Sequence, residues 1–337
     1  MPATMQDVAR KAGVSKTTVS RVINGVPNSA SSQTVDRILE AVEELGYAPN
    51  IIAASLKRLS TRTIGLIVGD IENPFFGSII RGVEATLQRS DYTLILANSS
   101  YKSELEEALA HTLLQRQVDA MILAPSTLAA GTWLRHANER NVHVLLVDNY
   151  IEGAQVDQVV VDNFDASFRA TKYLIELGHR RLAMIAGPHG RSTGSKRTDG
   201  FMAAFTDQSI VIEPQLVFEG DFSIESGYLG MQALLALRPL PTAVFIANNF
   251  MAVGAMKAIH EAGLAIPDQL SIISFDDMYW FPITSPSLTA ISQPAFEMGQ
   301  RAAERLLLRL NRTRQPRPER IELKTTLIVR ESTGPPP

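Results

Sequence analysis

The sequence predicts a small all-α head followed by a larger α/β body of two doubly wound parallel-sheet lobes. Three observations predict this arrangement. Apolar residues recur at helical spacing up to residue 46, short apolar runs alternate with helical segments beyond residue 62, and this second pattern occurs twice in succession. With 337 residues, the chain is also longer than the ~250 to 300 residues that a single core sustains.

The composition restricts the classes of function. With 45% hydrophobic and 20% charged residues, the chain is not expected to be disordered. The absence of cysteine excludes a disulfide framework, a thiol nucleophile and cysteine-ligated zinc. We expect no signal peptide and no contact with a membrane, because the start of the chain is polar and no apolar run reaches the ~18 residues of a membrane span. The expected location is therefore the cytoplasm.

Charge is divided unevenly along the chain, although the formal net charge is only −3. The residues up to Arg62 include eight basic and five acidic side chains, a net charge of +3, and the remainder carries −6. A basic end on an acidic body is expected when one small part of a chain contacts a polyanion and the rest does not.

The head is expected to contain three helices. Thr4 with Asp7 three residues later resembles a capping box, and Gly13 ends this first helix. Ser15 is expected to cap the second helix, in which apolar residues at i, i+3 and i+4 face inward. A third helix is expected to end at Gly46. The residues that this spacing leaves on the outer side of the second helix are Lys16, Thr17, Ser20, Arg21 and Asn24.

A helix, a turn at Gly13 and a second helix with short polar and basic side chains on its outer side form the helix-turn-helix arrangement. The second helix of this motif enters the major groove of DNA, where base edges can be distinguished. The pattern alone leaves open a three-helix bundle with an ordinary polar surface.

Three segments of the chain resemble the head of the lactose and purine repressor family, LacI/GalR. They read TMQDVARKAGVSKTTVSRVING, ILEAVEELGYAPN and AASLK. The resemblance extends over nearly the whole chain and implies a periplasmic-binding-protein-like core behind the head. It also implies a homodimer that binds a palindromic DNA operator and responds to a small-molecule effector.

On this interpretation the second helix reads DNA. We expect Lys16, Thr17 and Arg21 to reach base edges, with Arg21 making a bidentate guanine contact. Ser15, Thr18, Ser20 and Asn24 are expected to contact phosphates or to position the helix. The resemblance further implies that the hinge folds in the minor groove, where Leu56 is inserted and Lys57 lies beside it. Ala54 departs from the arginine that is frequent in the family, and a plain linker is the alternative for the hinge.

The body shows two series of strands. The first runs are expected at 64–68, 93–97, 118–123 and 142–147, and the second at 159–161, 182–186, 243–247 and 271–275. By resemblance, the chain crosses between the lobes near Asn163, Ile291 and Leu323. The predicted domains are a head over 1–48, a hinge helix or linker over 49–61, and a core over 62–337. Within the core, lobe 1 takes about 62–163 and 292–323, and lobe 2 takes about 164–291 and 324–332.

Ligands of open parallel sheets bind beyond the carboxyl ends of the strands. The residues that follow the predicted strands are hydrogen-bonding side chains and aromatic rings, a mixture that suits sugars. Some have a structural alternative: Asn249 and Asp276 could only cap helices or loops, and Phe75 and Phe76 could be core. The predicted effector-binding residues are Asn73, Phe75, Phe76, Asp148, Arg191, Arg197, Phe222, Asn248, Asp276 and Gln293.

The expected effector is a sugar or a sugar acid. The segment HGRSTGSKR is rich in cations, which favours an anion, and a positive charge at the start of the predicted helix containing Arg197 calls for a ligand. A purine-type co-repressor is the alternative effector class. An enzyme is not expected, because the chain has no nucleophile, phosphate-binding or zinc motif and its six histidines lack metal-ligand spacing. No metal and no cofactor are therefore predicted. The alternative of a sugar-binding or sugar-modifying protein is not favoured, because such a protein does not need a DNA-binding head.

Overall fold

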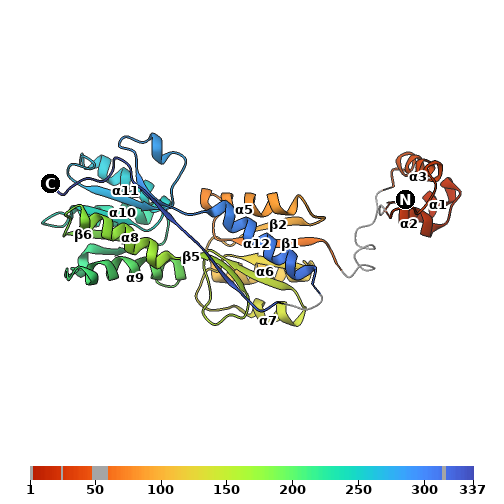
Figure 1. The fold of residues 1–337 in the computed structure, drawn as a ribbon, viewed down its shortest axis with the longest axis horizontal. Helices are drawn as coiled ribbons and strands as arrows, with labels where there is room; N and C mark the ends of the chain where they lie inside the picture. The colour runs from red at the N-terminus through yellow and green to blue at the C-terminus, as the bar shows by residue number, and fades with distance from the viewer. Residues whose placement is uncertain (1–2, 24–25, 48–59, 313–315) are drawn as a thin grey trace. The chain divides into compact units, whose positions relative to one another are not determined.

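The structure is a computed structural model, which describes residues 3–23, 26–47, 60–312 and 316–337. The chain divides into two compact units, Met1–Thr61 and Arg62–Pro337. We refer to the first unit as the head and to the second as the body, and we describe each by itself (Figure 1).

The head packs three helices around a small apolar core. They are α1 (Met5–Ala12), α2 (Lys16–Ile23) and α3 (Ser32–Glu44). Val8, Val19 and Ile38, one from each helix, are fully buried at the centre of this core. Each helix thus buries a single apolar stripe, as the spacing predicted.

Local hydrogen bonds set the helix starts in the head. The capping box of α1 is complete: Asp7 N donates to Thr4 Oγ1 at 3.3 Å, and Thr4 N donates to Asp7 Oδ2 at 3.0 Å. Ser15 Oγ accepts from Thr18 N at 3.1 Å and so begins α2. Between them Gly13 has φ of +65°, a left-handed conformation that glycine adopts without steric cost. The turn between α1 and α2 therefore follows from the sequence.

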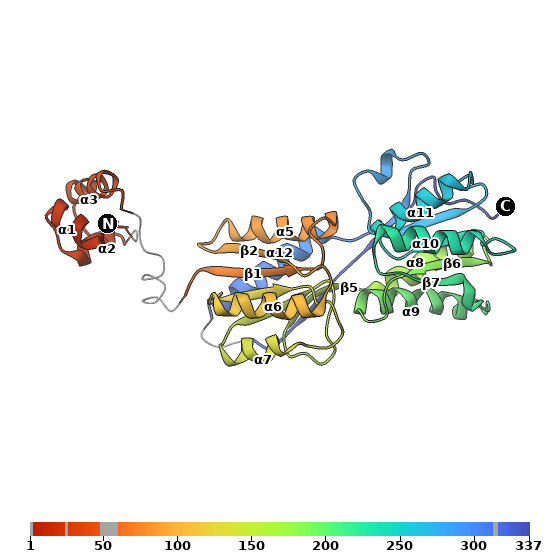
Figure 2. The same ribbon diagram turned by 180° about the vertical axis from the view of Figure 1, so that it is seen from behind.

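The body consists of two lobes, each a six-stranded sheet covered by helices on both faces (Figure 2). In lobe 1 the strand order is β11-β5-β4-β3-β1-β2, and every pairing is parallel. Helices α5 and α12 cover one face, and α6 and α7 cover the other. The elements are β1 (Thr63–Val68), α5 (Pro74–Leu87), β2 (Thr93–Asn98), α6 (Ser103–Gln115), β3 (Ala120–Leu123), α7 (Thr132–Glu139), β4 (His143–Val147), β5 (Asp157–Val161), α12 (Ala295–Leu310) and β11 (Arg320–Leu323).

Lobe 2 repeats this architecture with the strand order β12-β10-β9-β8-β6-β7. Its pairings are parallel except that β12 runs antiparallel to β10. The elements are α8 (Asn163–Glu176), β6 (Leu182–Ala186), α9 (Ser192–Asp207), η1 (Pro214–Leu216), β7 (Val217–Glu219), α10 (Ile224–Leu235), β8 (Ala243–Ile246), α11 (Asn249–Glu261), β9 (Ser271–Phe275), η2 (Phe281–Ile283), β10 (Thr289–Ser292) and β12 (Thr326–Ile328).

The chain passes between the two lobes three times. It enters lobe 2 between β5 and α8, returns to lobe 1 between β10 and α12, and crosses again between β11 and β12. Each lobe is therefore built from separate segments of the sequence.

The eight predicted strands coincide with β1 to β6, β8 and β9, with ends shifted by at most two residues. Four further strands were not predicted. Of these, β7, β11 and β12 have three or four residues each, and β10 also has four. β7, β11 and β12 are edge strands with half-buried or exposed residues, so they lack the continuous apolar run that marks the buried strands.

Candidate functional site

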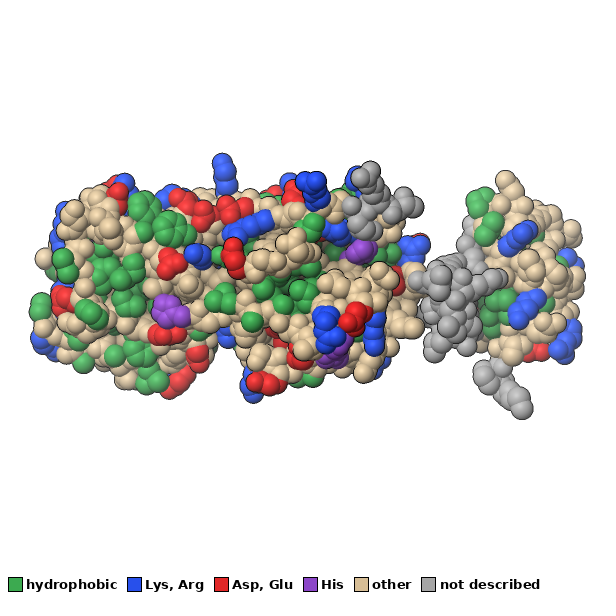
Figure 3. Space-filling model, turned by 90° about the horizontal axis from the view of Figure 1, so that it is seen from below, with side chains coloured by type: hydrophobic (Ala, Val, Ile, Leu, Met, Phe, Trp, Pro, Cys, Tyr) green, Lys and Arg blue, Asp and Glu red, His purple; other side chains and the backbone are tan. Residues whose placement is uncertain are grey.

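The outer side of α2 carries exposed polar and basic side chains. Lys16, Thr17 and Arg21 are exposed, whereas Thr18 and Ser20 are half-buried. Thr18 Oγ1 lies 2.8 Å from Ser15 Oγ, so the two hydroxyls cap α2 together. Figure 3 shows basic side chains on the visible face of the head. The structure thus presents three of the predicted DNA-binding side chains to solvent on one helix.

Cations in the head fall into two groups. On α1, Arg10 lies 3.2 Å from Asp7 and Lys11 contacts Glu44 of α3, so both charges are paired. On α2, neither Lys16 nor Arg21 forms an ion pair with any residue that the structure describes. In the described part of the head, the cations without an ion pair therefore lie on the helix expected to read DNA and, as Arg37, on α3. Predicted contacts at Asn24, Leu56 and Lys57 fall outside the described residues.

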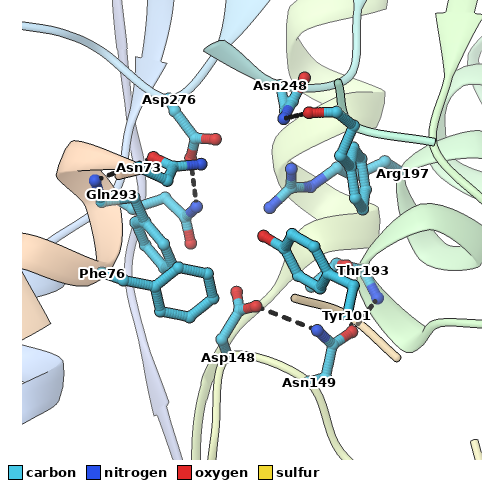
Figure 4. A pocket seen from close by; sticks show the side chains of 12 residues that line it. Asn73, Phe76, Tyr101, Asp148, Asn149, Thr193, Arg197, Asn248, Asp276 and Gln293 are labelled. Atoms are coloured by element: carbon cyan, nitrogen blue, oxygen red, sulfur yellow. Dashed lines mark hydrogen bonds between the residues drawn. The ribbon is translucent and has the colours of Figure 1, made fainter. Parts of the chain in front are cut away.

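A pocket lies between the lobes, at the carboxyl ends of strands from both sheets (Figure 4). Twelve residues line it. They are Asn73, Phe75, Phe76, Tyr101, Asp148, Asn149, Thr193, Arg197, Phe222, Asn248, Asp276 and Gln293. Nine of the ten predicted effector-binding residues are thus brought together, and the exception is Arg191.

Arg191 lies beside the pocket rather than in its wall. Its guanidinium lies over the Tyr101 ring, 4.0 Å from the ring centre, and its Nε donates to Ser126 O at 3.4 Å. A side chain that follows β6 was expected to reach the ligand directly, but Tyr101 occupies the space between Arg191 and the pocket.

Arg197 is held by lobe 2 alone. Its Nε donates to Asn163 Oδ1 at 2.8 Å, its Nη1 donates to Ala247 O at 2.6 Å, and its guanidinium lies 3.5 Å from the centre of the Phe275 ring. The prediction that Arg197 opens a helix was wrong, because α9 begins at Ser192 and places Arg197 in its second turn. Its burial and these contacts hold the guanidinium at the pocket. A position at the start of a helix is not the reason.

Asn248 lines the pocket as predicted, but the cap of α11 is Asn248 and not Asn249, which is the first residue of the helix. Asn248 caps α11 by accepting from Met251 N at 2.9 Å, and its amide donates to Phe222 O at 3.0 Å. Asn249 is fully buried and exchanges two hydrogen bonds with Asn73 of lobe 1, at 2.8 and 3.2 Å. The interpretation of Asn249 as only a cap was therefore wrong: it connects the two lobes.

A second inter-lobe contact surrounds Asn149 of lobe 1. Asn149 Oδ1 accepts from the hydroxyl of Ser192 at 3.1 Å and from the backbone and hydroxyl of Thr193 at 3.1 and 3.0 Å. Its amide nitrogen donates to Asp148 at 3.0 Å. The residues that follow β4 are thus oriented by the first turn of α9 in the other lobe.

Two buried carboxyl groups face Arg197 across the pocket. Burial raises the pKa of Asp148 to about 7, with Asp276 adding to the rise and Arg197 and Arg191 opposing it. Burial also raises the pKa of Asp276, while Arg197 and a hydrogen bond from Gln293 oppose this rise. Asp277 points elsewhere, since it pairs with Arg330 at 2.8 Å. The lining therefore has more carboxyl groups than cations.

The cation-rich segment 189–197, which includes the start of α9, does not concentrate charge in the pocket. His189 is exposed beside Glu219, and Lys196 is exposed and paired with Asp199 at 3.2 Å. Of the cations in this segment, only Arg197 lines the pocket. The argument from these cations for an anionic effector is thus not supported by the geometry.

Backbone strain is concentrated at the lining. Tyr101, Asp148, Phe222 and Asp276 have φ between +56° and +73°, a left-handed region that side chains other than glycine rarely adopt. Each such residue costs about 1 to 3 kcal/mol and persists only where its surroundings hold it in place. Clustering of this kind is typical of ligand sites.

Three lining residues were not among the predicted set: Tyr101, Asn149 and Thr193. Asn149 directly follows β4, next to the predicted Asp148, and Thr193 follows β6. Tyr101 follows β2, the edge strand of lobe 1, whose carboxyl end was not considered. The rule that ligands lie beyond strand ends would have found all three if applied to every strand.

A DNA-binding type of head joined to a two-lobed body with a polar and aromatic pocket defines a ligand-responsive regulator. Comparison with known proteins agrees. Residues 4–50 match the model of the bacterial regulatory proteins of the lacI family, and residues 171–333 match that of the periplasmic binding protein-like domain. The chain belongs to the LacI family of bacterial transcriptional regulators, which confirms the resemblance and the predicted fold.

Relatives of similar length support this assignment. The HTH-type transcriptional repressor PurR of Erwinia tasmaniensis is 37% identical over 333 residues, which cover 98% of this chain and 97% of the relative. The repressor CytR of Escherichia coli K12 is 36% identical over 332 residues, which cover 98% and 96%. The prediction of a regulator rather than an enzyme is confirmed by these repressors. As a DNA-binding regulator of this family, the protein acts in the cytoplasm.

Solved structures share the same architecture. A complex of the transcriptional regulator CelR with cellobiose has a TM-score of 0.75 and 32% identity, covering 98% of this chain and 100% of that one. The lac repressor dimer bound to operator and the anti-inducer ONPF has a TM-score of 0.86 and 27% identity, covering 99% and 100%.

No helix within the described residues is long and apolar enough to span a membrane. The described residues also contain no group of three or more histidine, cysteine, aspartate or glutamate side chains that could hold a metal ion.

Proposed function

We propose that this chain is a repressor that binds a palindromic operator as a homodimer at the nucleoid. A neutral sugar bound between the lobes controls the affinity of this repressor for DNA. The observation that carries the effector class is the pocket lining. Aromatic rings, amides, two hydroxyls, two carboxyl groups and one guanidinium line one pocket. Pyranose rings need apolar surfaces for their faces and hydrogen-bonding partners for every buried hydroxyl.

The charge of the lining favours a neutral sugar over a sugar acid. Asp148 and Asp276 face Arg197, so an added carboxylate on the ligand would meet two buried acidic groups and one cation. Both carboxyl groups can accept hydrogen bonds from sugar hydroxyls, and Arg197 can donate to one. A purine-type co-repressor remains the second candidate, since PurR repressors are among the similar relatives.

Operator recognition is assigned to α2 and the hinge. Lys16, Thr17 and Arg21 are exposed and supply the base contacts, with Thr18, Ser20 and Asn24 on the phosphates. Leu56 and Lys57 are assigned to the minor groove. A homodimer supplies two such heads, and the two-fold symmetry of a palindrome matches it. Tyr279 and Ile283, both 82% exposed around η2, are apolar candidates for the dimer contact.

Effector and operator are coupled through the body. A sugar that binds one arrangement of the lobes better than another shifts how the two hinges meet DNA, and the operator must then change sugar affinity by the same factor. Couplings of this kind are typically ~1 to 3 kcal/mol.

The DNA assignment is tested by Arg21→Ala. We expect a loss of ~1 to 3 kcal/mol in operator binding and relaxed preference at one base pair, measured by fluorescence anisotropy on a selected operator and its single-base variants. Arg10→Ala is the matched control, because Arg10 is exposed but paired with Asp7, and it should change binding little. An equal loss on all DNA sequences would make Arg21 a phosphate contact.

The effector assignment is tested by a thermal-shift screen of the full chain against neutral sugars, sugar acids, sugar phosphates and nucleobases. Neutral sugars should raise the melting temperature and change operator affinity in the same samples. A response to nucleobases alone would mean that the effector is of the purine type. A response to anionic ligands alone would contradict the proposal that the effector is a neutral sugar.

A further inference from the structure

Tyr101 is a side chain of the pocket that the proposed function leaves without a role. It follows β2 at the edge of lobe 1, and Figure 4 shows its hydroxyl pointing into the pocket. Burial raises the pKa of Tyr101, so the phenol stays protonated at neutral pH. Its hydroxyl makes no hydrogen bond with any residue that the structure describes. The Tyr101 side chain therefore occupies space in the pocket but makes no hydrogen bond to the described residues.

The Tyr101 ring is held in place from several sides. Gly69 leaves room for it, because a Cβ at that position would lie 2.1 Å from Cε1 of the ring. The Phe76 ring lies 6.3 Å away between centres, and the Arg191 guanidinium of lobe 2 lies 4.0 Å from the ring centre. Ser100 and Tyr101 both have left-handed backbone, with φ of +48° and +56°. This conformation is costly, so the surrounding contacts must maintain it.

The side chain of Arg191, which lies against the Tyr101 ring, is held by contacts of its own. Its Nε donates to Ser126 O at 3.4 Å, and Ser126 N donates to the buried carboxyl of Glu106 at 2.6 Å. Its Nη1 is buried and has no hydrogen-bond partner in the described part of the chain. A buried guanidinium nitrogen without a hydrogen-bond partner in the described residues thus lies next to the pocket. The side chain of Tyr101 separates it from the pocket.

We propose that Tyr101 sets the size and charge of the effector: its ring closes the pocket to a second sugar ring and shields the ligand from Arg191, so that the site accepts one neutral ring. This inference rests on the proposed sugar effector. Exclusion by a fixed side chain is a common source of specificity.

The test compares Tyr101→Ala, which removes the ring, with Tyr101→Phe, which keeps it. Isothermal titration of the full chain uses glucose, galactose and ribose, the disaccharides cellobiose and lactose, and glucuronate and galacturonate. Wild type and Tyr101→Phe should bind at least one monosaccharide and prefer it to the matched disaccharide and uronate by ~10-fold or more. Tyr101→Ala should reduce both preferences by ~10-fold, and adding Arg191→Gln should remove only the gain for the uronate.

Two outcomes overturn the inference and leave the sugar effector standing: wild type binds a disaccharide as tightly as its monosaccharide, or Tyr101→Ala discriminates as strongly as wild type. If no sugar binds wild type, the proposed effector fails instead.

A second measurement does not depend on which effector is in the panel. An enclosed cavity left by a large-to-small change binds a molecule of the missing shape. The free side-chain analogue p-cresol should therefore raise the melting temperature of Tyr101→Ala and leave Tyr101→Phe unchanged. A lack of stabilisation by p-cresol would show that the ring fills no preformed slot and would overturn the inference. Tyr101→Ser provides a second opened variant if the alanine variant does not fold.

Discussion

The two lobes contribute to the pocket in different ways. Lobe 2 holds its groups with its own contacts: Arg197 is fixed by Asn163, Ala247 and Phe275, all within that lobe. Lobe 1 positions several of its groups against the other lobe, as Asn149 does against Thr193. Asn73 likewise takes its amide partner from lobe 2. One half of the site is thus preformed, and the other is completed only when the lobes meet.

This difference assigns an order to binding. A ligand can dock on the preorganised groups of lobe 2, and the hydrogen bonds from lobe 1 then form together with the inter-lobe contacts. The free energy of closure is therefore part of the affinity. Changes in lobe 2 should weaken recognition itself, and changes at the inter-lobe bonds should mainly shorten the life of the complex.

The largest effect is expected from Arg197→Ala. Removing a buried guanidinium that faces Asp148 and Asp276 should cost ~2 to 5 kcal/mol of effector binding, because both carboxyl groups lose their charge partner. Titration of the effector measures this loss, and operator affinity without effector should persist.

Arg181→Ala is the matched control for Arg197→Ala. Arg181 is also a mostly buried arginine of lobe 2, but its partner is Glu213, which does not line the pocket. The control should lower thermal stability and leave effector affinity unchanged. Equal losses of affinity in both variants would mean that lobe 2 is not a preformed half-site.

A smaller effect is expected from Asn149→Ala. The change leaves the donors of Ser192 and Thr193 without their acceptor in the closed body, at a cost of ~1 to 3 kcal/mol. We expect the effector to dissociate ~10-fold faster with little change in its association rate, as measured by stopped-flow fluorescence. Ser99→Ala, which removes a 3.1 Å hydrogen bond to Val68 inside lobe 1, should not change the dissociation rate. A slower association with unchanged dissociation would contradict the proposed order.

The smallest effect concerns pH and the effector-free protein. The pKa of Asp148 rises from an ordinary 3.8 to about 7, so between these values the folded protein binds a proton that the unfolded chain does not. The free energy of unfolding should therefore decrease as pH rises from about 4 to 7. The Asp148→Asn variant should depend less on pH. Between pH 5 and 8 its melting temperature should fall by ~2 to 4 °C less than that of wild type. A pH profile identical to that of wild type would contradict the buried carboxyl.

Much of the fold and most of the pocket could be predicted from the sequence. Buried parallel strands appear as continuous apolar runs, and the polar residues just after them must gather at one edge of the sheet. For that reason Asp148, Asn248 and Asp276 were placed correctly from position alone. What they bind remains a prediction.

The failures have local physical causes. The cap of α11 is Asn248 rather than Asn249, one residue earlier than expected, and periodicity does not fix a helix start to one residue. The direction of Arg191 depends on stacking with Tyr101, a contact between residues 90 positions apart that no local pattern contains. Inter-lobe hydrogen bonds such as Asn73 with Asn249 have the same non-local origin.

The three crossings between the lobes constrain how the protein can be made. Helix α12, which buries Met298, Ala302 and Leu306 against the sheet of lobe 1, is encoded after nearly all of lobe 2. During translation, the part of this face formed by β3, β4 and β5, which α5 does not cover, therefore stays exposed until residues up to 310 have left the ribosome. Lobe 1 begins synthesis first but cannot finish folding first, so a prematurely terminated chain exposes that face to aggregation.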